Sequence, residues 1–147
     1  MGNEYGKSSH TTFRIELHLV WVTKYRYKVL NGAIGTRTRD LLRRIAGEER
    51  TEILFGSVSP DHVHMLVSLD PSVSVSTLMR QLKGKSSRLL QLEFPELKKR
   101  YWGQHLWARG YFCVSSGNVT TEMIAEYIKH HFENHEDPED PFRVEKP

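Results

Sequence analysis

Two strands and the turn between them are encoded in one continuous stretch near the middle of the chain. It reads Glu52-Ile53-Leu54-Phe55-Gly56-Ser57-Val58-Ser59-Pro60-Asp61-His62-Val63-His64-Met65-Leu66-Val67-Ser68-Leu69. The apolar and β-branched residues on either side of Pro60-Asp61 predict strands over Glu52–Ser59 and His62–Leu69. Proline and aspartate favour turns, so the short connection predicts a hairpin.

The pattern on both sides of this hairpin predicts the rest of the fold. Strands are expected over Thr12–Val22 and Tyr111–Ser115, and helices over Ala33–Arg50, Ser74–Phe94 and Thr121–Asn134. The order β-α-β-β-α-β is that of the α+β, ferredoxin-like (split βαβ, RRM-like) class, an antiparallel sheet with two helices on one face. A C-terminal helix carrying a tyrosine is added to it. The apolar stripe of the second helix is predicted to be Val75, Leu78, Leu82, Leu89 and Leu92.

Length and composition limit the class of protein. The chain has 147 residues, and we expect residues 1–134 to form one domain and the acidic residues 135–147 to form a disordered tail. Cys113 is the single cysteine, which excludes a disulfide framework and a cysteine-based zinc cluster. No apolar run approaches the roughly 18 residues of a membrane span. The polar N-terminus lacks a signal core, so we expect no membrane association and a cytoplasmic protein.

The net charge of +3 hides an uneven distribution along the chain. Residues 133–147 hold six acids and two bases, which leaves 19 of the 21 bases and 12 of the 18 acids in the body, a net +7. A small basic body suits a polyanionic partner. A solvated basic surface without a ligand is the alternative.

His62 and His64 stand two residues apart in the second strand of the hairpin. Because strand side chains alternate between faces, both imidazoles project from one face, while Val63, Met65 and Val67 project from the other. Two imidazoles so placed can ligate one divalent cation. The alternative is a pair of surface histidines beside a turn. The apolar neighbours favour a buried strand, in which neutral histidines need partners.

Tyr127 and His131 lie four residues apart in the last predicted helix and therefore share one face of it. A tyrosine on an amphipathic helix is ordinarily a packing residue with a hydrated hydroxyl, and a nucleophile is the alternative. His131 can complete a three-histidine metal site with His62 and His64.

The predicted helix Ser74–Phe94 carries the basic residues Arg80, Lys83, Lys85 and Arg88 around Gly84. Gly84-Lys85-Ser86 resembles the end of a P-loop, but Met79 replaces the required earlier glycine and the run lies inside a helix, so nucleotide binding is rejected. The bases indicate contact with a phosphate backbone or, alternatively, a solvated face. Gly84 costs the helix about 1 kcal/mol relative to alanine, which indicates close approach of another group.

Two segments interleave aromatic and basic residues, as single-stranded nucleic-acid binders do to hold phosphates and unstacked bases. An aromatic core with charged rims is the alternative. The segments are Trp21-Val22-Thr23-Lys24-Tyr25-Arg26-Tyr27-Lys28 and Arg100-Tyr101-Trp102-Gly103-Gln104-His105-Leu106-Trp107-Ala108-Arg109-Gly110-Tyr111-Phe112.

Five stretches, in this order, resemble the single-tyrosine HUH transposases of the TnpA type, the IS-two-hundred-like group that includes REP-associated tyrosine transposases. They span about Phe13 to Asn134, and each is unspecific alone. The stretches are Leu17-His18-Leu19-Val20-Trp21-Val22-Thr23-Lys24-Tyr25-Arg26, Pro60-Asp61-His62-Val63-His64-Met65-Leu66-Val67, Leu82-Lys83-Gly84-Lys85-Ser86-Ser87-Arg88, Leu106-Trp107-Ala108-Arg109-Gly110-Tyr111-Phe112 and Glu126-Tyr127-Ile128.

The resemblance implies a DNA transposase that cuts and rejoins single-stranded DNA, with hairpin ends, through a covalent 5′-phosphotyrosine on Tyr127. His62 and His64 are implied to hold a divalent metal, Mg2+ or Mn2+, with His131 at the place where the family commonly has glutamine. A homodimer with active sites completed in trans is implied. The candidate DNA contacts are Lys24, Arg26, Lys83, Lys85, Arg88 and Arg109.

Three other functions are considered. An RRM-like module that binds single strands without catalysis predicts aromatics on its central strands, whereas His62, His64 and Leu66 occupy the open face here. A histidine-dependent phosphodiesterase usually needs a third motif histidine or two His-x-Ser/Thr motifs, and His64 is followed here by Met65-Leu66. A domesticated relative that acts on chromosomal repeats remains an alternative.

Overall fold

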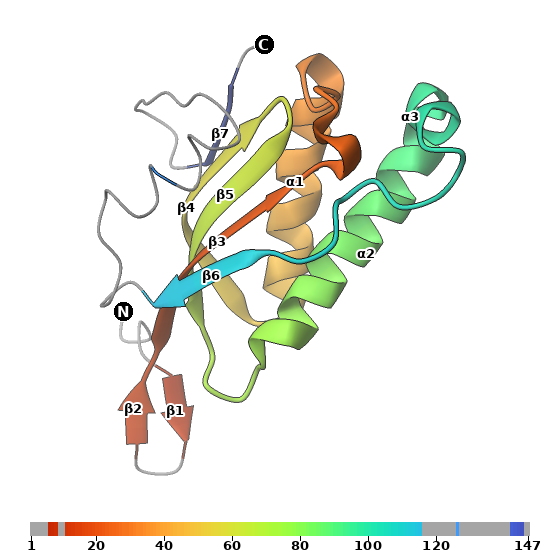
Figure 1. Cartoon of the computed structure of the whole chain (residues 1–147). Helices are drawn as coiled ribbons and strands as arrows, with labels where there is room; N and C mark the ends of the chain where they lie inside the picture. The colour runs from red at the N-terminus through yellow and green to blue at the C-terminus, as the bar shows by residue number, and fades with distance from the viewer. Residues whose placement is uncertain (1–5, 9–10, 116–125, 127–141, 146–147) are drawn as a thin grey trace.

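The computed structural model describes residues 6–8, 11–115, 126 and 142–145. Its centre is a five-stranded sheet in the order β6-β3-β5-β4-β7 (Figure 1). The strands are β3 (Ile15–Val22), β4 (Thr51–Ser59), β5 (His62–Leu69), β6 (Phe112–Ser115) and β7 (Phe142–Val144). Helices α1 (Gly32–Glu48) and α2 (Val75–Glu93) cover one face, and the described residues therefore confirm the ferredoxin-like class.

Strand alternation builds the core between the sheet and these helices. Val63, Met65 and Val67 of β5 are fully buried there, beside Leu19 and Trp21 of β3. From α2 the core receives Leu78, Met79, Leu82 and Leu90. The prediction that Leu92 belongs to the buried apolar stripe is wrong, because its side chain is 64% exposed. At this end of the helix Leu90 faces the core, and Leu92 lies outside the core face.

The N-terminal strand differs from the sequence prediction. The predicted strand Thr12–Val22 divides into β2 (Thr11–Phe13), which pairs with β1 (Gly6–Ser8) in a separate hairpin, and β3. Arg14 lies between them, where its guanidinium donates to the hydroxyl and the carbonyl oxygen of Ser68. The pairing of β3 with β5 begins only at Ile15.

Two short helices were not predicted. The 3-10 helix η1 (Lys24–Arg26) follows β3, and α3 (Pro95–Arg100) begins directly after α2. The predicted helix Ser74–Phe94 does end before Pro95, and Pro95 then opens α3, because proline is well suited to the first helical position. The predicted helix Thr121–Asn134 lies outside the described residues except for Glu126, which is helical. None of the described helices has the length and apolar character needed to cross a membrane.

Part of the predicted disordered tail is a strand. β7 runs parallel to β4 at the edge of the sheet, with Phe142 opposite Gly56. The Phe142 side chain is 1% exposed and belongs to the core. The sequence prediction followed the acidic composition of residues 135–147 and underweighted the alternating apolar residues Phe142 and Val144.

Candidate functional site

The two histidines of the hairpin lie on the sheet face opposite the helices. His62 and His64 alternate with Val63 and Met65 along β5, and the latter two point into the core. This confirms the prediction that both imidazoles share one face. The turn at Pro60-Asp61 sets the register, since Ser59 of β4 pairs with His62.

Asp61 is the immediate partner of His62. Nδ1 of His62 and Oδ1 of Asp61 are 3.2 Å apart, and both residues are almost completely buried. A carboxylate at Nδ1 fixes the tautomer and orientation of an imidazole and leaves Nε2 as the ligating atom, an arrangement common around metal-binding histidines. Asp61 was predicted only as a turn residue, and its carboxylate is a further part of the site.

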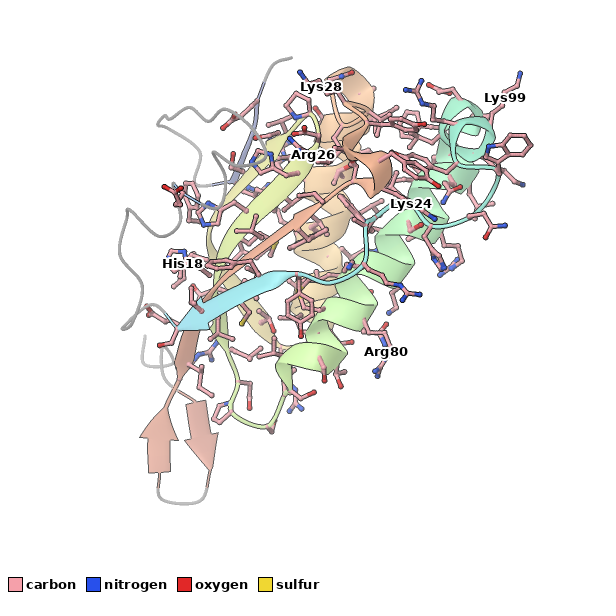
Figure 2. The ribbon with its side chains drawn as sticks, viewed as in Figure 1. His18, Lys24, Arg26, Lys28, Arg80 and Lys99 are labelled. Carbon is pink, nitrogen blue, oxygen red and sulfur yellow. The ribbon has the colours of Figure 1, made fainter. Side chains whose placement is uncertain are left out.

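His18 of β3 is the partner of His64, and sequence reasoning did not assign it a role. Nδ1 of His18 and Nε2 of His64 are hydrogen-bonded at 3.2 Å, and the two rings are stacked with centroids 5.4 Å apart. Figure 2 shows His18 on the side of the sheet away from α2. The available signal was a histidine among the apolar residues of Leu17–Val20, but the pairing of β3 with β5 was needed to place it.

The surroundings keep the imidazole of His64 neutral. Burial, followed by the neighbouring His18 and His62, lowers the pKa of His64 from its ordinary 6.5 to about 3. Burial also lowers the pKa of His18, against a smaller opposite effect of Glu16. A neutral imidazole is the form that binds a cation.

Tyr127 and His131 lie outside the described residues, so their predicted roles stay predictions. Among the residues that the structure describes, no cluster of three or more His, Cys, Asp or Glu side chains is arranged to hold a metal ion. The described part of the predicted metal site is therefore the pair His62 and His64.

The two aromatic and basic segments come together at one end of the sheet. Thr23 forms a β-bridge with Trp107, and the amide of Lys24 donates to the carbonyl of Leu106. The guanidinium of Arg100 lies 4.0 Å from the ring centroid of Tyr27. The two segments, which are separate in the sequence, therefore form one surface in the folded protein.

This surface and α2 border a cavity of about 870 Å³ that is open to solvent. It is lined by four of the predicted DNA contacts and by one further base, and no described lining residue is acidic. The four are Lys24, Lys83, Arg88 and Arg109, and the further base is Lys98. Figure 2 shows Lys24 near the meeting point of η1, α2 and α3.

The other two predicted DNA contacts do not line the cavity. Lys85 points toward α1, where its ammonium lies 3.2 Å from a carboxylate oxygen of Glu48. Arg26 is exposed on η1. Lys83 is also engaged, since Nζ donates to the carbonyls of Ala108 and Gly110 at 2.8 Å, and burial lowers its pKa.

Residues of α2 hold the far wall of the cavity in place. The hydroxyl of Ser87 accepts from the amide of Leu106, and the hydroxyl of Ser86 accepts from the indole of Trp107. Nε2 of Gln91 donates to the carbonyl of Gln104 at 2.7 Å. These bonds explain why polar residues lie on the buried side of an amphipathic helix.

The histidine pair on one sheet face and the basic cavity beside α2 are together typical of a nucleic-acid-processing protein of ferredoxin-like fold. The chain belongs to the IS200-like transposase family, because the family model described as "Transposase IS200 like" matches residues 11–131. This is a family of enzymes.

Two relatives show how closely the chain follows this family. It is 35% identical to the ISDra2 transposase TnpA of Deinococcus radiodurans over 126 residues, 86% of this chain and 90% of the relative. It is 36% identical to the transposase for insertion sequence element IS200 of Salmonella typhimurium over 133 residues, 90% of this chain and 86% of the relative.

Two solved structures are similar as well. A Deinococcus radiodurans R1 protein described as a transposase matches 87% of this chain and 98% of its own, with a TM-score of 0.76 and 33% identity. A REP-associated tyrosine transposase bound to a REP hairpin matches 86% of this chain and 76% of its own, with a TM-score of 0.55 and 13% identity. This structure is similar in fold.

Proposed function

We propose that this transposase cuts and rejoins single-stranded DNA through a covalent bond between Tyr127 and a 5′-phosphate. The observation that carries the proposal is the pair His62 and His64, which share the open sheet face in a member of the IS200-like family. Their partners Asp61 and His18 orient the two rings, and the pKa of His64 is lowered to about 3 by burial and its neighbours.

The donor set suits a divalent cation. His62 is oriented through Nδ1 by Asp61, and His64 stays neutral at physiological pH. We propose His131 as the third ligand. Bound there, Mg2+ or Mn2+ would supply Lewis-acid stabilisation of the charge that develops on the scissile phosphate.

Tyr127 is the proposed nucleophile. Its phenol oxygen forms a bond to phosphorus while the 3′-oxygen of the neighbouring nucleotide leaves, which yields a 5′-phosphotyrosine and a free 3′-OH. A free phenol has a pKa near 10, so a nearby cation or base must assist loss of its proton. The new ester retains the energy of the phosphodiester, and a second 3′-OH can therefore reverse the step without ATP.

The proposed DNA contacts are the bases already named, with Lys24, Lys83, Arg88 and Arg109 around the cavity and Arg26 and Lys85 outside it. A hairpin in the DNA is a further part of the proposal, supported by a REP hairpin on a relative of the same fold. We also propose a homodimer in which Tyr127 of one subunit acts at the histidines of the other.

The decisive experiment is a covalent-adduct assay. The full chain is mixed with single-stranded oligonucleotides tiled across both flanks of its own gene, with Mg2+ or Mn2+, and analysed on a denaturing gel. We expect a metal-dependent protein–DNA band that is lost in Tyr127→Phe and in His64→Ala.

Tyr111→Phe is the matched control, because it removes the hydroxyl of an exposed tyrosine that is not the proposed nucleophile and keeps the aromatic ring of its segment. It should form the adduct at the wild-type rate. An adduct of undiminished yield in Tyr127→Phe would show that another residue is the nucleophile.

A further inference from the structure

Gly84 is a glycine that the packing of the described chain does not require. It lies inside α2, where glycine is less favourable than alanine. A Cβ added to it would meet no neighbouring atom within 4 Å, whereas at Gly56 a Cβ would strike Phe142 and at Gly35 it would strike Val144 and the backbone of Leu30. Packing explains those two glycines and leaves Gly84 unexplained.

Gly84 lines the basic cavity. On the same face of α2, one and two turns further on, lie Ser87, Arg88 and Gln91, which line it too. Lys24, Lys98 and Arg109 line it from the facing segments. The missing side chain therefore opens the helix backbone toward a space surrounded by cations.

Trp102, the chain neighbour of the lining residue Gly103, is the second unexplained residue. Its side chain is 86% exposed, and its φ of 56° lies in the left-handed region, which is strained for a bulky residue. It occupies the position after a helix C-terminus that glycine normally takes. The next residue, Gly103, lines the cavity.

We propose that this cavity binds an unpaired nucleotide of the DNA, with the sugar-phosphate backbone passing over Gly84 and the base stacked on Trp102. The absence of a Cβ at Gly84 lets a backbone approach the helix, and Lys24, Arg88 and Arg109 offset the phosphate charge. An exposed indole offers the stacking surface that unpaired bases need. This inference rests on the proposed function, because it requires that the chain bind DNA.

The test uses Gly84→Ala in the full chain. Alanine fills empty space in a helix, so the thermal midpoint should rise by about 2–4 °C. The same methyl group obstructs the DNA backbone, so the Kd for single-stranded DNA should increase roughly tenfold at fixed salt. Opposite changes in stability and affinity cannot come from misfolding.

Gly47→Ala is the matched control. Gly47 lies in the last turn of α1, a Cβ there also meets nothing within 4 Å, and the residue does not line the cavity. It should leave the Kd for DNA unchanged. An unchanged Kd in Gly84→Ala would overturn the backbone part of the proposal.

Trp102 is tested separately by two substitutions. Trp102→Gly removes the ring and suits the left-handed backbone, so the thermal midpoint should not fall, while the Kd for single-stranded DNA should rise about 5-fold to 150-fold. Trp102→Phe keeps an aromatic ring and should retain most of the affinity. Equal affinities of Trp102→Gly and the wild type would overturn the stacking part.

A parallel titration with the same sequence fully paired to its complement separates unpaired from duplex DNA. Trp102→Gly should weaken binding to the single strand only. An equal loss of affinity for the duplex would contradict the proposal. If the wild-type protein binds neither DNA, the proposed function itself fails. If it binds and forms the Tyr127 adduct while the Gly84 and Trp102 variants bind equally well, only this inference fails.

Discussion

The imidazoles of His62 and His64 are placed by different partners. His62 has a carboxylate at Nδ1, and His64 has the ring of His18 at Nε2. A carboxylate that orients a ligating histidine usually contributes 10-fold to 100-fold to metal affinity. Asp61 therefore acts on the proposed metal site through His62.

Asp61→Asn tests this positioning role. The amide keeps the shape of the side chain but removes its charge, so Mn2+ affinity should fall roughly 10-fold to 100-fold. Isothermal titration of the full chain measures it. Asp70→Asn, at a partly exposed loop aspartate, is the control and should not change the affinity. Equal Mn2+ affinity in Asp61→Asn would show that the Asp61–His62 pair only stabilises the turn.

The low pKa of His64 predicts a loss of stability in acid for the metal-free protein. Between the ordinary pKa of 6.5 and the folded value of about 3, the unfolded chain binds a proton that the folded protein does not. The free energy of unfolding must therefore fall as the pH is lowered from 6.5 toward 3.

Urea unfolding in the presence of a chelator measures this dependence. The midpoint should decrease between pH 6.5 and pH 4, and His64→Gln should show a flatter dependence because it lacks the titrating group. The same slope in His64→Gln and the wild type would assign the acid sensitivity to other groups.

At the scale of elements, β7 completes the sheet edge beside β4. Phe142 fills the space above Gly56, Val144 contacts Gly35 of α1, and the carboxylate of Glu145 accepts hydrogen bonds from Ser57 and Ser59. Gly56 is explained by this strand, since a side chain there would collide with Phe142, whereas a side chain at Gly35 would collide with both Val144 and the backbone of Leu30. β7 is therefore an integral part of the fold.

Phe142→Ala should reduce the free energy of unfolding by about 3 kcal/mol, because it removes a fully buried ring and leaves a cavity. Chemical denaturation measures the change. Leu92→Ala removes an apolar side chain that is 64% exposed and should alter stability by no more than about 0.5 kcal/mol. Similar losses in the two variants would mean that β7 contributes little.

At the scale of the whole molecule, the proposed dimer joins Tyr127 of one subunit to the histidines of the other. Tyr127→Phe and His64→Ala are each expected to be inactive alone. A mixed dimer contains one site with intact histidines and an intact tyrosine, so random mixing should restore about one quarter of the wild-type adduct.

The measurement is adduct formation after the two variants are unfolded together and refolded, which allows subunits to exchange. Each variant refolded alone provides the control. No recovery in the mixture, with a dimer present by light scattering, would place Tyr127 and the histidines of one active site in the same subunit.

The sequence by itself determined the sheet-and-helix order, the shared face of His62 and His64, and the family. These follow from local periodicity, since alternation along a strand and spacing along a helix are set within a few residues. The hairpin over residues 52–69 was predictable for this reason, with strand limits that differ by one residue at most.

Only the tertiary structure decided which distant residues meet. His18 reaches His64 because β3 pairs with β5, and Lys24 meets Leu106 because the two aromatic segments bridge. β7 was missed because its stability comes from long-range packing against Gly56 and Gly35, while its acidic surroundings indicated disorder. Gly84 was visible in the sequence, but the empty space in front of it appears only when α2 and the facing segment 103–109 are folded together.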